Sequence, residues 1–75
     1  MGLSINELYE QYERSIALQS DIIASCRRDL EKARKERKNI QAAELHRYLR
    51  ILYDEKLELM ANAHELRKYI ETTQS

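Results

Sequence analysis

The sequence predicts an all-α fold, an antiparallel hairpin of two helices that pack as a coiled coil. Three observations support this prediction. Ala, Glu, Lys, Leu and Arg make up 40 of the 75 residues, a composition typical of long or coiled helices. The chain has no Pro and its only Gly is Gly2, so it has few places for the tight turns of sandwiches and barrels. Apolar residues also recur at alternating steps of four and three in two separate stretches.

The first helix is expected to span residues 4–36, because its start carries two helix-initiation signals. Ser4 and Glu7 form an S-x-x-E capping box, and Leu3 and Leu8 flank it as a hydrophobic staple. A seam with heptad spacing follows, and eight of its nine positions are apolar. The seam consists of Ile5, Tyr9, Tyr12, Ile16, Gln19, Ile23, Cys26, Leu30 and Ala33.

A reversal of the chain is expected at residues 36–39. Continuing the first seam at the same steps gives mostly charged residues, beginning with Arg37. The break falls in a charged run that ends at Asn39, a residue type that favours helix N-caps and left-handed turn positions. The alternative is one continuous helix of about 65 residues in a parallel coiled coil, which the break in the seam disfavours.

The second helix is expected over residues 40–71, followed by a frayed C-terminus at 72–75. Its seam again has eight apolar residues in nine positions: Ala42, Leu45, Leu49, Leu52, Lys56, Leu59, Ala63, Leu66 and Ile70. Because a chain of this length can form one small core at most, residues 1–75 are expected to make a single helical-hairpin domain.

Antiparallel pairing of the two seams places Ile5 opposite Ile70 at the end that holds the termini. In this register the only polar residue of each seam, Gln19 and Lys56, falls in the same layer. A polar layer penalises slipped and parallel pairings, so these two residues are expected to set the register and orientation. A catalytic role for Lys56 would need a substrate cavity, which a narrow seam does not offer.

Large apolar side chains also lie outside the seams, on both flanks of the predicted hairpin. A lone hairpin would leave them in water, at a cost of about 25 cal/mol per Å². We therefore expect a homo-oligomer, most simply a two-fold symmetric dimer that forms a four-helix bundle. The expected dimer or partner surface consists of Leu8, Leu18, Ile22, Tyr48, Ile51 and Tyr69 on one flank and Tyr53, Leu57 and Met60 on the other.

Charge is unevenly distributed along the chain although its total is zero. Residues 27–50 contain nine basic and four acidic residues, and the rest of the chain contains four basic and nine acidic ones. The turn end of a hairpin is therefore basic and the other end acidic, which suits antiparallel dimers or a contact with nucleic-acid phosphates. No aromatic residue for base stacking lies between residues 27 and 40. The expected phosphate contacts are Arg27, Arg28, Lys32, Arg34, Lys35, Arg37, Lys38 and Arg47.

Other functional classes lack their residue patterns. His46 and His64 do not have the spacing of zinc or di-iron ligands, so no metal or other cofactor is expected. The single Cys26 cannot form an intramolecular disulfide and is expected to pack as a small apolar residue in a reducing compartment. No apolar run is long enough for a bilayer, and the start lacks a signal-peptide pattern, so a cytoplasmic protein without membrane association is expected.

These features predict a non-enzymatic protein–protein interaction module, such as a small adaptor, chaperone-like or regulatory subunit, that self-associates through apolar helix faces. No Gly-rich phosphate loop and no strand-to-helix turn that could present a nucleophile is present, so no catalytic residue is assigned. The alternative is a small nucleic-acid-binding regulator that contacts phosphates through the basic hairpin tip.

Overall fold

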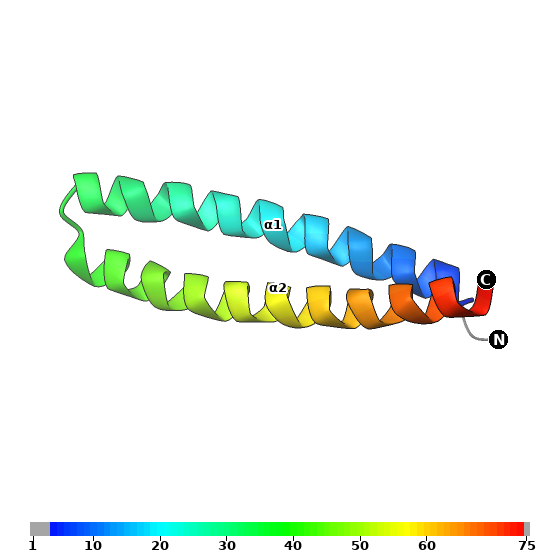
Figure 1. Cartoon of the computed structure of the whole chain (residues 1–75). Coiled ribbons are helices and arrows are strands. Elements are labelled where there is room, and N and C mark those ends of the chain that lie inside the picture. Colours follow the sequence, from blue (N-terminus) through cyan, green and yellow to red (C-terminus); the bar gives the residue numbers. More distant parts are fainter. Residues whose placement is uncertain (1–3, 75) are drawn as a thin grey trace.

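The computed structural model describes residues 4–74 as two long antiparallel helices joined by a short turn (Figure 1). Helix α1 covers Ile5–Lys35 and helix α2 covers Asn39–Gln74. The hairpin measures 55 × 19 × 18 Å, and the start of α1 and the end of α2 both lie at the end opposite the turn. No strand occurs within residues 4–74, so the predicted all-α hairpin is confirmed and the continuous helix is wrong.

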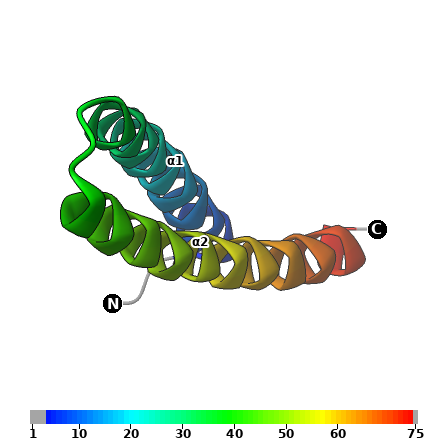
Figure 2. The same ribbon diagram turned by 90° about the vertical axis from the view of Figure 1, so that its left-hand side faces the viewer.

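The axes of the two helices are inclined to each other rather than parallel. In Figure 1 the ribbons are separated at the turn and cross toward the other end, whereas in Figure 2 the last part of α2 swings away from α1. Contacts between the helices follow the predicted register. Gln19 bonds Leu52 and Glu55, and Cys26 contacts Leu45, each within about one helical turn of the expected antiparallel pairing.

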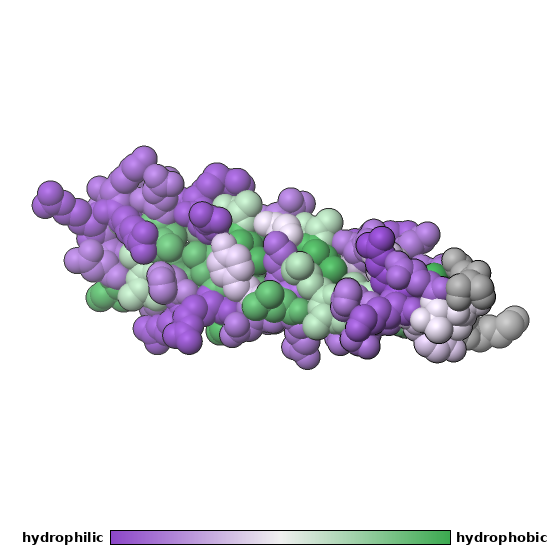
Figure 3. Space-filling view, viewed as in Figure 1, coloured by the Kyte–Doolittle hydropathy of each residue, from purple (hydrophilic) through white to green (hydrophobic). Residues whose placement is uncertain are grey.

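The two predicted seams form the interface between the helices. Every buried or half-buried side chain among residues 4–73 belongs to a seam, apart from Ser20, whose hydroxyl bonds the Ile16 carbonyl at 2.9 Å. Ile5, the first seam position and the first residue of α1, is 39% exposed. Figure 3 shows hydrophobic surface along the middle of the hairpin between hydrophilic borders. The buried residues are Ile23, Cys26, Leu30, Ala33, Leu49, Leu52 and Ala63.

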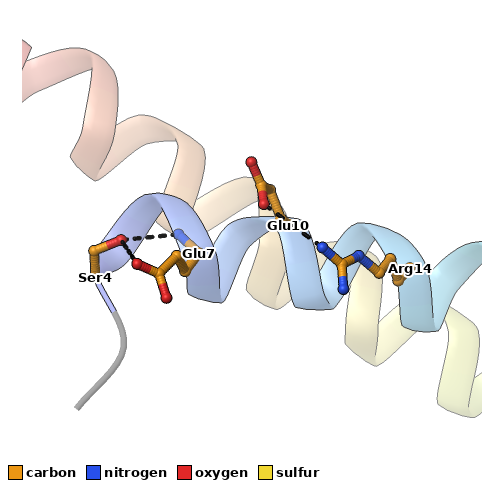
Figure 4. Close-up of polar contacts among 4 residues, drawn as sticks. All are labelled: Ser4, Glu7, Glu10 and Arg14. Atoms are coloured by element: carbon orange, nitrogen blue, oxygen red, sulfur yellow. Dashed lines mark hydrogen bonds and ion pairs between the residues drawn. The ribbon is translucent and has the colours of Figure 1, made fainter. Parts of the chain in front are cut away.

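Helix α1 begins after Ser4, as predicted. The Ser4 side-chain oxygen accepts a hydrogen bond from the Glu7 backbone N–H at 3.2 Å, and its hydroxyl donates to Glu7 Oε1 at 3.2 Å (Figure 4). The Glu7 carboxylate thus accepts a hydrogen bond from the Ser4 hydroxyl. In a capping box it would instead accept one from the Ser4 backbone N–H. Glu10 and Arg14 add an exposed ion pair at 3.7 Å. Leu3 of the expected staple lies outside the described residues.

The turn is a Schellman motif whose left-handed residue is Arg37. The Lys38 N–H donates to the Ala33 carbonyl at 2.9 Å and the Arg37 N–H to the Arg34 carbonyl at 3.1 Å, which satisfies carbonyls that a helix end leaves free. The Lys38 carbonyl then accepts the first hydrogen bond of α2, so Lys38 takes the N-cap position. Asn39 is already helical, and the expectation that it would be the N-cap or left-handed residue is wrong, because the reversal is completed before it.

Replacing Arg37 with glycine should stabilise the hairpin by about 1 kcal/mol. Arg37 has a φ of 58°, and this left-handed region costs a residue with a Cβ about 1–2 kcal/mol, which glycine avoids at some cost in chain entropy. Arg37→Ala is the matched control, because it removes the same charge and keeps the Cβ. Urea unfolding should give a higher midpoint for the glycine variant than for the alanine variant, and equal midpoints would contradict strain at this residue.

Helix α2 ends later than the sequence indicates. It continues to Gln74, so the predicted end at 71 is three residues early, and residues 72–74 of the expected frayed segment are helical. The Thr72 and Thr73 hydroxyls donate to the carbonyls of Lys68 and Tyr69, one turn earlier, at 2.8 and 3.0 Å. These bonds satisfy the threonine hydroxyls within the helix, where the polar composition alone indicated an irregular end.

Candidate interaction surfaces

The apolar residues predicted on the first flank are all exposed. We call this set the broad flank; its side chains come from both helices, lie outside the seam and are each 36–62% exposed. The broad flank consists of Leu8, Leu18, Ile22, Tyr48, Ile51 and Tyr69. Large apolar side chains of a stable monomer are more often scattered singly, so a flank that carries six of them is a candidate contact surface.

The opposite flank carries fewer apolar side chains, and all of them belong to α2. Tyr53, Leu57 and Met60 are 39%, 62% and 46% exposed. Sequence reasoning missed Ile40, which is 80% exposed directly after the turn. Ile40 follows a charged run and lies where the first seam is interrupted, so its apolar character alone did not indicate a surface.

Part of the predicted basic end forms a groove between the two helices. This basic groove has a volume of about 950 Å³. Its walls are Arg27, Arg28, Arg34 and Lys35 of α1 and His46, Arg50 and Tyr53 of α2, and Leu30 and Leu49 lie at the helix interface beneath them. Four of the eight predicted phosphate contacts are therefore brought together.

The other four predicted phosphate contacts lie outside the groove. Arg37 and Lys38 form the turn, Lys32 lines separate shallow hollows, and Arg47 is not part of the groove wall. The eight residues consequently do not make one cluster at the hairpin tip. Whether a basic residue reaches the groove depends on the side of the helix that it occupies. An α-helix has 3.6 residues per turn, so neighbours in sequence point in different directions.

The groove also contains residues that sequence reasoning missed. Tyr53 supplies the aromatic ring that the segment 27–40 lacks, since the opposite helix brings it beside Arg27, whose Nη1 donates to the Tyr53 hydroxyl at 3.4 Å. Arg50 and His46 join the wall in the same way. The antiparallel register could have found them, because it places positions near 50 level with positions near 25.

Most of the positive charge in the groove is unpaired. Glu31, the one acidic residue of the lining, pairs with Lys35 at 3.8 Å. Among residues 4–74, no carboxylate forms an ion pair with the four arginines of the groove. Planar guanidinium groups bind phosphates or carboxylates in a bidentate manner, so the groove is suited to an anionic ligand.

Gln19 and Lys56 both lie half-buried in the seam, as the predicted polar layer requires. Gln19 Nε2 donates to the Leu52 carbonyl at 3.1 Å and to Glu55 Oε2 at 3.0 Å, so α1 is bonded to α2 at this layer. Within residues 4–74, Lys56 forms no hydrogen bond or ion pair. A lysine stem can pack in such a seam while its ammonium group stays in water.

Tyr9 and Tyr12 are half-buried seam residues. The Tyr9 hydroxyl lies between Glu13 of its own helix and Arg67 of α2. The hydrogen bond to the Glu13 carboxylate raises the pKa of Tyr9, and the charge of Arg67 acts in the opposite direction. Tyr9 therefore interacts with charged groups of both helices.

Cys26 packs in the core, with its side chain 6% exposed and its Sγ 3.8 Å from the Leu45 carbonyl. Burial raises the pKa of the Cys26 thiol, and the charge of Asp29 adds to this effect. The thiol is consequently protonated and shielded, which are the properties of a structural rather than a reactive cysteine.

Cys26 should react with a disulfide reagent such as DTNB at least about tenfold more slowly in the native chain than in urea, because reaction requires local opening. Reaction of the native chain at the unfolded rate would contradict the burial of Cys26.

The raised pKa of the Cys26 thiol also makes the stability of the fold depend on pH. The unfolded chain gives up its thiol proton at lower pH than the folded chain, so the contribution of the protonated thiol to stability is full below the ordinary thiol pKa. It is lost as pH rises toward the raised folded pKa. Cys26→Ala should remove this part of the alkaline loss in urea titrations.

Among residues 4–74, no three His, Cys, Asp or Glu side chains lie close enough together to hold a metal ion. Neither helix has a stretch apolar and long enough to cross a bilayer.

The sequence matches no protein-family model, and no curated protein or solved structure matches it significantly.

Proposed function

We propose that the chain is a non-enzymatic protein-interaction module that self-associates through the broad flank. The observation that supports this proposal is the exposure of six large apolar side chains on one flank of a thin hairpin. Their transfer out of water contributes about 25 cal/mol per Å², and a second copy offers the same apolar flank in return. The product is a two-fold symmetric coiled-coil dimer, a four-helix bundle.

The size of the hairpin supports a dimer of this kind. Stable complexes bury about 800 Å² on each partner, which is about one eighth of the 6209 Å² exposed by the hairpin. Among residues 4–73, no side chain is less than 2% exposed. A second hairpin would add the layer of burial that a two-helix core lacks.

Charge favours an antiparallel arrangement of the two copies. Each hairpin has an excess of five positive charges in residues 27–50 and of five negative charges in the rest of the chain. A two-fold axis across the middle of the broad flank lays the basic turn end of one copy over the acidic end of the other. Such complementarity selects orientation and speeds association more than it adds affinity.

The opposite flank stays free in this dimer and can bind a second protein. Tyr53, Leu57 and Met60 are of the types, aromatic and flexible apolar, that protein interfaces favour. An adaptor, chaperone-like or regulatory subunit uses a self-associated scaffold to present such surfaces. The single unpaired cysteine agrees with the reducing conditions of the cytoplasm, where we place the protein.

Sedimentation equilibrium tests the self-association directly. The expected result is a reversible species of twice the 9.0 kDa chain mass that gains population with protein concentration and changes little with salt. A thermal midpoint that rises with concentration is the linked outcome, since association stabilises the folded chain. A folded species of 9.0 kDa at every concentration would overturn the proposal.

A further inference from the structure

We propose that the basic groove binds single-stranded nucleic acid, through phosphate contacts from its arginines and a base stacked on Tyr53. The groove is formed within one hairpin and its aromatic residue belongs to the flank opposite the proposed dimer contact. Binding in the groove therefore goes beyond self-association and can succeed or fail independently of it.

The positive charge of the groove comes from both of its walls. Arg27, Arg28 and Arg34 line it from α1 and Arg50 from α2, and these four guanidinium groups have no carboxylate partner among the described residues. A ligand that runs between the walls meets cations on both sides. Uncompensated arginines at this density attract a polyanion, and phosphate oxygens match their bidentate geometry.

The remaining surface of the groove suits sugars and bases. Leu30 and Leu49 lie beneath the charged walls, and the Tyr53 side chain is 39% exposed. A cationic groove combined with an aromatic platform is the usual composition of sites for single strands. The Arg27 Nη1 to Tyr53 hydroxyl contact at 3.4 Å holds a phosphate-binding group beside the ring. A phosphate and its neighbouring base can thus be bound together.

The length of the groove sets the size of the ligand. Its α1 wall runs from Ala24 to Lys35, which is about 16 Å at 1.5 Å per residue. A stacked strand rises about 3.4 Å per nucleotide, so about four or five nucleotides span this wall. A duplex fits less well, because the protein is too wide to enter its major groove. The protein is 18–19 Å across, and the DNA major groove is about 12 Å wide. Contact with the outside of a duplex would leave Tyr53 unused.

Fluorescence anisotropy with labelled oligo(dT) and oligo(U) of about twelve nucleotides tests the proposal. With four phosphates neutralised, the affinity should fall about 50-fold between about 50 and 200 mM salt, a slope of about −3 in log–log form. A double-stranded DNA of the same length is the comparison ligand, and it should bind the protein more weakly than the single strands do. The oligomeric mass is measured in the same buffer, so that loss of binding and loss of association are separated.

Variants of equal charge loss locate the binding to the groove. Arg27→Gln with Arg34→Gln should lower the affinity at least about tenfold and reduce the salt slope by about 1.4. Lys32→Gln with Arg47→Gln removes the same charge within the basic end but outside the groove wall, and should change the affinity little. Both pairs are exposed, so circular dichroism should show the parent fold for each.

Substitutions at Tyr53 test the stacked base. Tyr53→Phe keeps the ring and should retain binding, whereas Tyr53→Leu should weaken it at least about fivefold, the lower limit for loss of one stacked base. Three results would each overturn the proposal: no saturable binding at low salt, equal weakening by the two charge-loss pairs, or a duplex bound as tightly as the single strands. Tight binding to a single strand with no difference between the Tyr53 variants would likewise refute the stacked base.

Discussion

Ile23→Ala is expected to destabilise the hairpin by about 2–5 kcal/mol, the cost of truncating a buried isoleucine. Ile23 is 4% exposed and packs in the cluster with Cys26, Leu30, Leu49 and Leu52. A core this small supplies only a few kcal/mol in total, so the variant should lose most of its cooperative unfolding transition. At about 4–8 °C per kcal/mol for a domain of this size, any transition that remains should have its midpoint lowered by roughly 10–40 °C.

Ile40→Ala is the matched control for this experiment. It removes the same atoms from a side chain that is 80% exposed, so its effect should stay within about 0.5 kcal/mol. Thermal unfolding is followed at 222 nm at one fixed protein concentration, so that the concentration dependence from association is the same for both variants. Equal losses would show that the Ile23 layer does not hold the helices together.

Ile51→Glu is expected to dissociate the proposed dimer while leaving the hairpin folded. Ile51 is 54% exposed on the broad flank, so the change costs a single hairpin little. Burial of the exposed half of this isoleucine in an interface is worth about 0.8–1.6 kcal/mol, and two-fold symmetry counts it twice. At 1.4 kcal/mol per factor of ten, the dimer should weaken at least about tenfold.

Leu57→Glu provides the control on the opposite flank. Leu57 lies on the same helix and is 62% exposed, so the two variants add the same charge at similar exposure. Sedimentation of both at several concentrations should show a monomer for Ile51→Glu and a parent-like dimer for Leu57→Glu. Dissociation by Leu57→Glu alone would move the self-association to the other flank, and no effect from either would remove both flanks as the contact.

The seams were predictable because heptad spacing acts through a short-range rule. A position such as Leu30 or Leu52 faces the other helix whenever the chain is helical, so its burial follows from spacing alone. The opposite end of the seam was less predictable. Ile5 has the correct spacing but is 39% exposed, because it is the first residue of α1 and no earlier turn of that helix covers it.

The turn was located correctly, but its geometry was not. A charged run without glycine gave no sequence signal for the left-handed residue, and Arg37 takes that conformation because the bonds to Ala33 and Arg34 require it there. The basic groove likewise depends on pairing. Tyr53 and Arg50 are far from Arg27 in sequence, and only the antiparallel packing brings the three together.

The amino-acid sequence by itself determined the two helices, the side of each that is buried, the position of the reversal and the exposure of the apolar flanks. These follow from periodicity and capping, which act over a few residues. Tertiary structure decided the partners of Gln19, the handedness at Arg37 and the joining of arginines from two helices around one tyrosine. Such features depend on the inclination and the register of one helix against the other. Two regular seams pack similarly over a range of small shifts in register, and only the packing of the side chains selects one register.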